Sequence, residues 1–190
     1  MKFTRLKIPE VILCQPEIIG DNRGYFLESF RQDKLESFLG HQINFCQDNE
    51  SVSSYGVLRG LHYQLPPYSQ TKLVRVIKGS VLDVAVDIRS GSETFGKHIS
   101  IELTAKNKKQ LFIPRGFAHG FVVLSKEAIL SYKVDNYYNH NFDRGIIYND
   151  KHLNIDWKLK ENLLKLSEKD INQPIFNKAE YFNKSIKLYE

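Results

Sequence analysis

The sequence predicts a mainly β protein, a small barrel of short strands with a few helical additions. From about Asn44 to Asn149 the chain is a succession of alternating, β-branched segments, at spacings typical of a β-sandwich or barrel. The 190 residues are 42% apolar and 12% aromatic, which is the composition of a globular chain. The sequence shows no repeat, low-complexity tract or linker. We therefore expect residues 1–190 to form one domain.

The first part of the chain is expected to hold extended segments and one helix. Residues 1–31 are punctuated by prolines and by a turn at Gly20–Gly24. Asp33 and Glu36 then form a candidate capping box for a short helix, and Gly40 is the residue type that commonly ends one. The expected apolar face of this helix consists of Leu35, Phe38 and Leu39.

The central segments are expected to be strands. Leu73–Gly79 and Val81–Arg89 alternate in hydropathy, and the short connection at Lys78–Gly79–Ser80 predicts that they pair as a hairpin. Further strands are expected in the segments HISIEL, KQLFIPRGFAHGFVVLS and AILSYKVDNYY. Residues 158–170 are expected to be helical or a loop leading into a helix. The polar tail from Phe176 is expected to be mobile or docked late, and we assign it no role.

Composition argues against several classes of protein. The net charge of +5 comes from 27 basic and 22 acidic residues spread along the chain, without the basic block typical of nucleic-acid binding. A pocket for a small diphosphate explains the same excess. Cys14 and Cys46 lack CxxC spacing and are expected to be buried free thiols in a reducing compartment. No apolar run suits a signal segment or a membrane span, so we expect a cytoplasmic protein without membrane contact.

Two nucleotide-binding motifs are absent or incomplete. Gly91–Lys97 fits most of the phosphate-binding loop pattern GxxxxGK[ST]. However, His98 stands where Ser or Thr should hold magnesium, and the next residues, ISIEL, are typical of a strand and not of the required helix. We predict a hairpin loop here. The sequence contains no GxGxxG, which argues against a nicotinamide-binding Rossmann unit.

The sequence also contains the spacing of a metal-binding motif in which some of the ligands have been replaced. Small barrels of the cupin type commonly bind metal through HxH, a Glu ahead of a Gly, and a His in PxGxxH. Here PxGxxH is present and ends at His119, but His62-Tyr63-Gln64 replaces HxH. Lys72, with six residues between it and Gly79, takes the place of the carboxylate. An ammonium group repels a divalent cation, so we predict that the site holds an anion and no metal.

Polar residues gather around His62 in the same strand pair. Arg59, Gln64 and Lys72 are its neighbours in the sequence pattern, which favours a site over an ordinary core histidine. Strict alternation would point Arg59 and His62 to opposite faces. A β-bulge at Gly60 would bring both side chains inward. Without the bulge, Arg59 is an ordinary exterior charge.

Three tyrosines have two interpretations each. Tyr132 has the β-propensity of a plain strand residue, but a tyrosine facing a histidine across a pocket could donate a proton. Tyr137 and Tyr138 could cover a barrel rim or present their rings to a nucleobase. The residues alone leave these alternatives open.

With these residues assembled, the chain resembles the dTDP-4-dehydrorhamnose 3,5-epimerase family from about Ile8 to Pro174. The matching segments, in chain order, are GDNRGYFLESF, FCQDNESVSSYGVLRGLHYQ, TKLVRVIKGSVLDVAVDIR, FIPRGFAHGFVVLS, YKVDNYY, RGIIYND, LNIDW and LSEKD. The resemblance implies a cupin-type double-stranded β-helix, or jelly-roll, barrel with short helices on its N-terminal side and at its C-terminus. It also implies a homodimer that needs neither cofactor nor metal.

The resemblance also implies roles for residues at matching positions. His62 corresponds to the base, Asp170 to the carboxylate that holds it, Tyr132 to the opposed proton donor, and Lys72 to the group beside the developing oxyanion. The implied substrate-binding residues are Arg23, Phe26, Glu28, Gln47, Asp48, Asn49, Arg59, His119, Tyr138, Asp143 and Lys169. Tyr138 matches a ring that stacks on thymine, and Asp143 stands where relatives often carry Glu. In the family the N-terminal strands cross to the neighbouring subunit, so Arg23, Phe26 and Glu28 are expected to serve the partner's pocket.

The implied activity is epimerisation of a dTDP-linked 4-keto-6-deoxy sugar at carbons 3 and 5, a step of dTDP-L-rhamnose and cell-surface polysaccharide synthesis. A mono-epimerase acting at carbon 3 or carbon 5 only is the alternative on the same scaffold. From other classes, a non-catalytic nucleotide-sugar-binding barrel and a metal-dependent cupin isomerase or oxygenase are also considered. The sequence does not separate single from double inversion, or one nucleotide from another.

Overall fold

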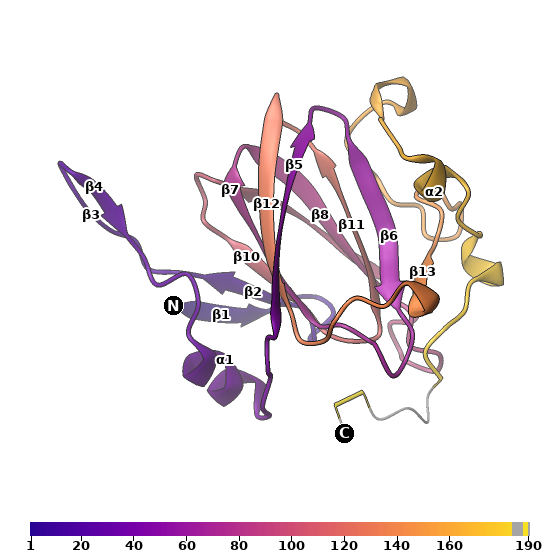
Figure 1. The fold of residues 1–190 in the computed structure, drawn as a ribbon, viewed down its shortest axis with the longest axis horizontal. Coiled ribbons are helices and arrows are strands. Elements are labelled where there is room, and N and C mark those ends of the chain that lie inside the picture. The colour runs from indigo at the N-terminus through magenta and orange to yellow at the C-terminus, as the bar shows by residue number, and fades with distance from the viewer. Residues whose placement is uncertain (184–187, 190) are drawn as a thin grey trace.

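The computed structural model describes residues 1–183, 188 and 189, and it shows two β-sheets that face each other (Figure 1). Within these residues, one sheet has six strands in the order β1 (Lys2–Arg5), β2 (Ile12–Gln15), β10 (Gln110–Ile113), β7 (Lys72–Lys78), β12 (Glu127–Val134) and β5 (Gln47–Ser54). The other has five, in the order β13 (Asp143–Gly145), β6 (Leu58–Gln64), β11 (Phe117–Val123), β8 (Ser80–Asp87) and β9 (His98–Thr104). The predicted mainly β, jelly-roll fold is confirmed.

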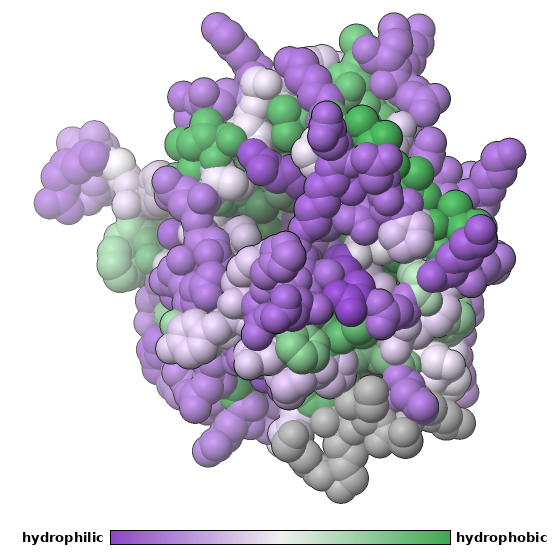
Figure 2. Space-filling view, turned by 45° about the vertical axis from the view of Figure 1, so that its right-hand side comes forward, coloured by the Kyte–Doolittle hydropathy of each residue, from purple (hydrophilic) through white to green (hydrophobic). Residues whose placement is uncertain are grey.

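Smaller elements surround the sheets. β3 (Ile19–Asp21) and β4 (Gly24–Phe26) form a separate hairpin that stands out from the body, seen at the left of Figures 1 and 2. The two α-helices of the described residues are α1 (Gln32–Leu39) and α2 (Glu168–Ile171). Three 3₁₀ turns are described, η1 (His140–Phe142), η2 (Glu161–Leu163) and η3 (Phe176–Lys178). No helix in this part of the chain is long and apolar enough to cross a membrane.

Apolar side chains are buried on both faces of the five-stranded sheet. Between the sheets lie residues such as Val74, Ala85 and Leu130. On the outer face, the C-terminal segments cover β6, β8 and β11, and Trp157 and Phe176 are buried there. Because β8 is covered on both faces, nearly all of its side chains are buried, which explains its almost continuous apolar sequence. Each large side chain buried in this way contributes roughly 1.5–3 kcal/mol.

The predicted hairpin between Leu73–Gly79 and Val81–Arg89 is wrong. β7 pairs with β10 and β12, whereas β8 pairs with β9 and β11 in the other sheet. The turn at Gly79 therefore carries the chain from one sheet to the other. Gly79 has a φ of 78°, and a Cβ there would lie 2.1 Å from the Glu127 carbonyl oxygen, so only glycine fits this crossing. The loop around Gly91–Lys97, by contrast, does join a hairpin, β8 to β9.

The start of α1 also differs from the prediction. Its N-cap is Arg31 and makes no side-chain cap hydrogen bond, so the capping box is wrong. Asp33 instead pairs with Arg31, and Glu36 accepts the backbone N–H of Ile43. The predicted end is confirmed, since Gly40 is left-handed and donates its N–H to the Glu36 carbonyl. Leu35, Phe38 and Leu39 pack against the six-stranded sheet as expected.

One further expectation is corrected, and an alternative left open for the tail is decided. Cys14 is buried, but Cys46 is exposed, so only one of the two thiols lies in the core. The described residues of the tail are docked, because Phe176 and Phe182 are buried and the Ser90 N–H bonds the Phe182 carbonyl at 2.8 Å. Further along, the Tyr189 hydroxyl accepts the Arg115 N–H at 3.1 Å. The tail, expected to be mobile or docked late, also includes residues 184–187 and 190, which lie outside the described residues.

Candidate active site

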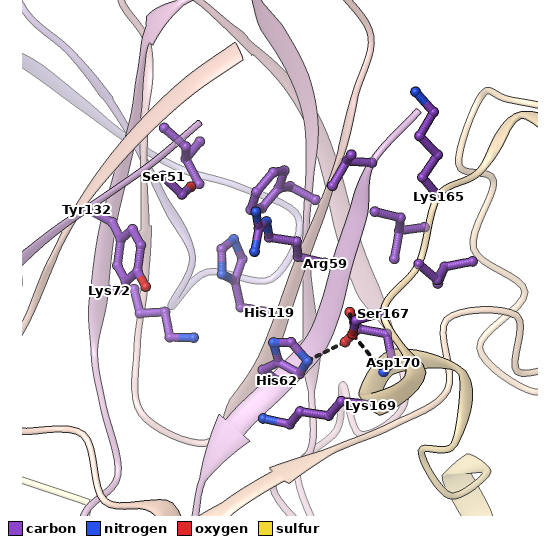
Figure 3. A pocket seen from close by; sticks show the side chains of 15 residues that line it. Ser51, Arg59, His62, Lys72, His119, Tyr132, Lys165, Ser167, Lys169 and Asp170 are labelled. Atoms are coloured by element: carbon purple, nitrogen blue, oxygen red, sulfur yellow. Dashed lines mark hydrogen bonds and ion pairs between the residues drawn. The ribbon is translucent and has the colours of Figure 1, made fainter. Parts of the chain in front are cut away.

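A cavity of about 530 Å³ opens between the two sheets (Figure 3). Strands β5, β6, β7, β11 and β12 supply its walls, and the segment that leads into α2 closes one side. Most of its polar side chains carry positive charge or can gain it. The polar lining consists of Ser51, Arg59, His62, Lys72, His119, Tyr132, Lys165, Ser167, Lys169 and Asp170.

His62 and Asp170 form a hydrogen-bonded pair on one wall. The distance from His62 Nε2 to Asp170 Oδ1 is 2.5 Å, and the Asp170 side chain is only 4% exposed. The second carboxylate oxygen accepts the Ser167 hydroxyl at 2.7 Å. Although burial raises the pKa of Asp170, its hydrogen bonds with His62 and Ser167 outweigh burial and leave the pKa below its ordinary value. Asp170 therefore stays ionised and fixes the orientation of the imidazole.

The predicted bulge at Gly60 accounts for the direction of Arg59. His119 of β11 lies opposite His62, and Phe121 lies opposite Arg59, so β6 has one residue more than β11 between these pairs. Gly60 has a φ of 128° and packs against Gly120 of the neighbouring strand. As a result both Arg59 and His62 line the cavity, and the alternative of an exterior Arg59 is excluded.

Tyr132 and Lys72 lie across the cavity from His62 (Figure 3). Lys72 is opposite Val134 in the β7–β12 ladder, so its side chain and that of Tyr132, two residues away, share the inner face. Burial lowers the pKa of Lys72 to about 8. Burial also raises the pKa of Tyr132, which keeps the phenol protonated at neutral pH.

A second histidine–aspartate pair lies deeper in the barrel. His119 Nε2 is 3.0 Å from both oxygens of Asp83, and both side chains are buried. Burial lowers the pKa of His119, although Asp83 acts in the opposite direction. Asp83 comes from the apolar strand β8, and its bond to His119 explains how a carboxylate is accommodated there.

The mouth of the barrel forms an adjoining cavity of about 410 Å³. It shares His62, Lys72, Tyr132 and Lys169 with the first cavity, so the two form one continuous site. The other predicted residues that line the mouth are Gln47, Asn49, Tyr138 and Asp143. The Tyr138 hydroxyl donates to Asp143 at 2.9 Å, and Lys169 pairs with the same carboxylate.

The donor set of the site does not suit a cation. Lys72 and Arg59 point into the cavity, and each acid there is already engaged, Asp170 with His62 and Asp143 with Lys169. Among the described residues, no three His, Cys, Asp or Glu side chains come together as metal ligands. The chemistry that this arrangement supports is binding of an anion, together with proton removal on one wall and proton donation on the other.

Comparison with known proteins gives a consistent result. The family model for dTDP-4-dehydrorhamnose 3,5-epimerase matches residues 5–178. A relative of that name from Shigella flexneri is 52% identical over 182 residues, which is 96% of this chain and 99% of the relative. The chain belongs to the dTDP-4-dehydrorhamnose 3,5-epimerase family.

Solved structures of this family superpose closely on the chain. The epimerase from Elizabethkingia anophelis is 50% identical with a TM-score of 0.90, over 93% of this chain and 97% of that one. The epimerase from Legionella pneumophila, solved with dTDP-4-keto-L-rhamnose, is 47% identical with a TM-score of 0.90 and covers 93% of each chain. The resemblance stated from the motifs is therefore confirmed, and so is the fold that it implied.

Four predicted residues lie outside the epimerase cavity of their own chain. Asp48 points to the outer face of β5, where it pairs with Lys133, because neighbouring residues of a strand alternate between faces. Arg23 and Phe26 belong to the projecting hairpin, and Arg23 pairs with Asp21 there. Glu28 pairs with Arg31 and Lys34 ahead of α1. Arg23, Phe26 and Glu28 therefore do not line the cavity of their own chain.

The cavity of this family member also contains residues that the sequence analysis missed. They include Ser51, Phe121, Lys165 and Ser167, and behind the cavity wall Asp83, which bonds His119. Asp83 had a signal, since a charged residue in a strand as apolar as VLDVAVD requires a partner. Ser167 had one as well, because a Ser three residues ahead of an acid is a helix-capping pattern, and Ser167 does cap α2. Ser51 and Lys165 carry no such signal.

Proposed function

We propose that the protein converts dTDP-4-dehydro-6-deoxy-α-D-glucose into dTDP-4-dehydro-β-L-rhamnose by inverting carbons 3 and 5. The proposal is supported by family membership, by relatives of that name at about half sequence identity, and by a base and an acid on opposite walls of one cavity. The opposed pair carries the argument. A binding module has no use for it, and inversion needs it, because a single base that returned its own proton would restore the starting centre.

Proton removal is the task of His62. The ketone at carbon 4 acidifies the hydrogens on carbons 3 and 5, so a weak base such as an imidazole can remove them. Asp170 accepts a hydrogen bond from His62 Nε2, which directs the free Nδ1 to the substrate and stabilises the imidazolium that forms. A general base of this kind contributes about 10²–10⁴-fold to the rate.

Lys72 stabilises the enolate that follows. Its side chain lies beside Tyr132 and lines both the inner cavity and the mouth (Figure 3). Positive charge placed beforehand at a developing oxyanion is worth roughly 3–4 kcal/mol, by analogy with oxyanion-hole mutations. Arg59 and His119 add donors around the sugar and diphosphate.

Tyr132 completes the inversion by donating a proton from the opposite face. Its raised pKa, caused by burial, keeps the hydroxyl protonated until the enolate forms.

The nucleotide part of the substrate occupies the mouth, where it is surrounded by Gln47, Asn49, Tyr138, Asp143 and Lys169. No step calls on a metal or a cofactor.

We further propose that residues 1–190 act as one domain within a cytoplasmic homodimer. The support for the dimer is the projecting hairpin, on which Ile19, Tyr25 and Phe26 are 62%, 58% and 64% exposed. Exposed apolar side chains in such number mark an interaction surface. Arg23, Phe26 and Glu28, which lie on or beside this hairpin, would then serve the neighbouring protomer's site. The cytoplasmic location is supported by two cysteines that form no disulfide.

The test is proton NMR of dTDP-4-keto-6-deoxy-glucose incubated with the protein in deuterated water, with and without a metal chelator. Deuterium should enter carbons 3 and 5, and the coupling constants should change to those of the L-lyxo sugar. His62→Ala should abolish both exchange and inversion while dTDP binding persists. Tyr132→Phe should still exchange hydrogen but invert poorly, because only the donor on the second face is lost.

Other results would redirect the proposal. Exchange at one carbon only would make the protein a mono-epimerase. No exchange by the native protein would leave a nucleotide-sugar-binding barrel, and loss of activity with chelator would indicate a metal-dependent isomerase. If His62→Ala kept more than about a tenth of the activity, His62 would not be the base.

A further inference from the structure

Gln64 lies two residues after His62 on β6 and is buried, with 4% exposure. Its side chain makes three hydrogen bonds, all to loop backbone. Nε2 donates to the Tyr68 carbonyl at 2.7 Å and to the Tyr137 carbonyl at 3.2 Å. Oε1 accepts the backbone N–H of Asn139 at 2.6 Å. Both amide hydrogens are thus used within the protein.

The bonded loops form part of the rim of the nucleotide end of the cavity. One joins β6 to β7, and the other joins β12 to η1. The loops also bond each other, because Gln70 donates to the Asn136 carbonyl at 2.8 Å and Asn136 donates to the Pro67 carbonyl at 2.9 Å. Gln64 connects this pair of loops to the strand that carries His62.

The side chain of Gln64 holds the backbone on both sides of Tyr138. Its amide bonds Tyr137 before the ring and Asn139 after it. The Tyr138 ring itself is 55% exposed and lines the mouth beside Asp143 and Lys169. An aromatic ring kept open to solvent on a fixed backbone offers a flat, preorganised face for a planar group, and little freedom is lost when that group binds.

We propose that Gln64 is a positioning residue that holds Tyr138 ready to stack on the nucleobase of the substrate. Strand β6 then fixes both ends of the substrate at once, through His62 at the sugar and through Gln64 at the base. This inference rests on the proposed function, because it takes the group at the mouth to be the nucleobase of a nucleotide sugar. It assigns Gln64 no part in proton transfer.

The test compares Gln64→Leu and Gln64→Glu with a matched control, Asn107→Leu. Leucine removes all three bonds, whereas glutamate keeps the acceptor for Asn139 and loses both donors. Asn107 makes three similar bonds, two from backbone N–H groups and one to the Glu102 carbonyl, in the β9–β10 turn outside both cavities. The control therefore reports the general effect of losing amide–backbone bonds. Calorimetric titrations would use dTDP and, as a probe without a base, inorganic pyrophosphate.

Both Gln64 variants should weaken dTDP binding by about 10-fold to 100-fold, the range that a few unmet buried hydrogen bonds produce. KM should rise by a similar factor. Pyrophosphate affinity and kcat at saturation should stay within about threefold, the same margin expected of Asn107→Leu for every quantity. If Gln64→Leu does not fold, as judged by circular dichroism, Gln64→Glu decides alone.

The inference is overturned if dTDP affinity is unchanged in the folded variants. It is also overturned if dTDP and pyrophosphate weaken equally, or if kcat falls while KM does not. These results are separable from failure of the proposed function, which is read from the native protein. Native protein that binds dTDP but shows no turnover would remove the epimerase assignment, and the dTDP titrations would still decide the role of Gln64.

Discussion

Lys72 is the residue whose charge matters most to the proposed chemistry, and burial makes its ammonium group easier to deprotonate. Burial lowers its pKa to about 8. If the ammonium stabilises the enolate, kcat/KM of the free enzyme should fall as pH rises through about 8. The measurement is kcat/KM between about pH 6 and pH 10. Lys72→Met, which has no charge at any pH, should lose about 10²–10³-fold in kcat.

Lys72→Arg is the control for this pH dependence. Arginine keeps its charge over the whole measured pH range. The decline near pH 8 should therefore disappear from the profile, even if the rate is lower throughout. A native profile that stayed flat to about pH 10 would contradict the role of Lys72.

The effect of Lys72 on stability has the opposite sign to its effect on activity. From about 8 to the ordinary value of 10.5 the unfolded chain holds the proton more tightly, so this residue makes the fold more stable as pH rises.

For single residues, the prediction was more successful for the catalytic side chains than for the other residues that line the cavity. His62, Lys72, Tyr132 and Asp170, the four residues to which the family resemblance gave catalytic roles, all line one cavity. Asp48 was named with its neighbours as a triplet, although strand alternation alone sends it to the other face. Ser51 and Lys165 could not be found, since a serine or lysine in a polar stretch has the same pattern whether it faces solvent or a cavity.

Among the elements, β6 depends on one glycine for its course. A Cβ on Gly60 would lie 2.5 Å from Gly120 Cα and 2.8 Å from the His119 carbonyl oxygen, at a φ of 128°. Gly60→Ala should therefore lower the free energy of unfolding by about 3 kcal/mol or more, from backbone strain and overpacking together. It should also reduce activity, because the bulge directs both Arg59 and His62 inward. Urea unfolding and turnover are the measurements.

Gly24→Ala is the matched control for Gly60→Ala. Gly24 has a similar φ of 134°, but nothing lies within 4 Å of an added Cβ. It should therefore show the strain alone, about 1–2 kcal/mol. Equal losses in the two variants would mean that contact with Gly120 contributes nothing to the course of β6.

The elements also show what local sequence can and cannot specify. The bulge was predictable because Arg59 and His62 stand in a polar cluster at odd spacing around a glycine. The partner of β7 was not predictable, because an alternating strand accepts any antiparallel neighbour and a short turn can cross between sheets. The capping box failed for a similar reason, since Asp33 and Glu36 found better partners in Arg31 and Ile43.

For the whole molecule, motif order was a stronger guide than composition. Eight segments in sequence order predicted the family and the fold, and both are confirmed. Composition could not indicate how the layers are covered. Trp157, Phe176 and Phe182 come from a region of mixed, polar sequence, yet they close the outer face of the five-stranded sheet. This region docks there because the outer face of that sheet is apolar. That property becomes visible only once the fold is known.

The β3–β4 hairpin stands out from the body of the described chain, and the Lys108 ammonium donates to its Tyr25 hydroxyl. We predict a homodimer of twice 22.1 kDa in which the hairpin of each protomer completes the other's site. Light scattering after gel filtration gives the mass. Phe26→Ala should then impair activity although its ring lies outside the cavity of its own chain. The decisive measurement mixes two proteins, Phe26→Ala and His62→Ala, each defective in a different part of the site, after mild unfolding and refolding together.

In a mixed dimer the Phe26→Ala protomer has an intact His62 and receives an intact hairpin, so one of its two sites is whole. Random pairing should then restore activity to about a quarter of the native level. Mixing His62→Ala with Asp170→Ala is the control, because both changes damage the barrel that carries them and no exchange of hairpins can repair either one. Recovery in the first mixture and none in the second would show that the hairpin acts across the interface. No recovery in either, from a protein that runs as a monomer, would mean that Arg23, Phe26 and Glu28 have no part in the site.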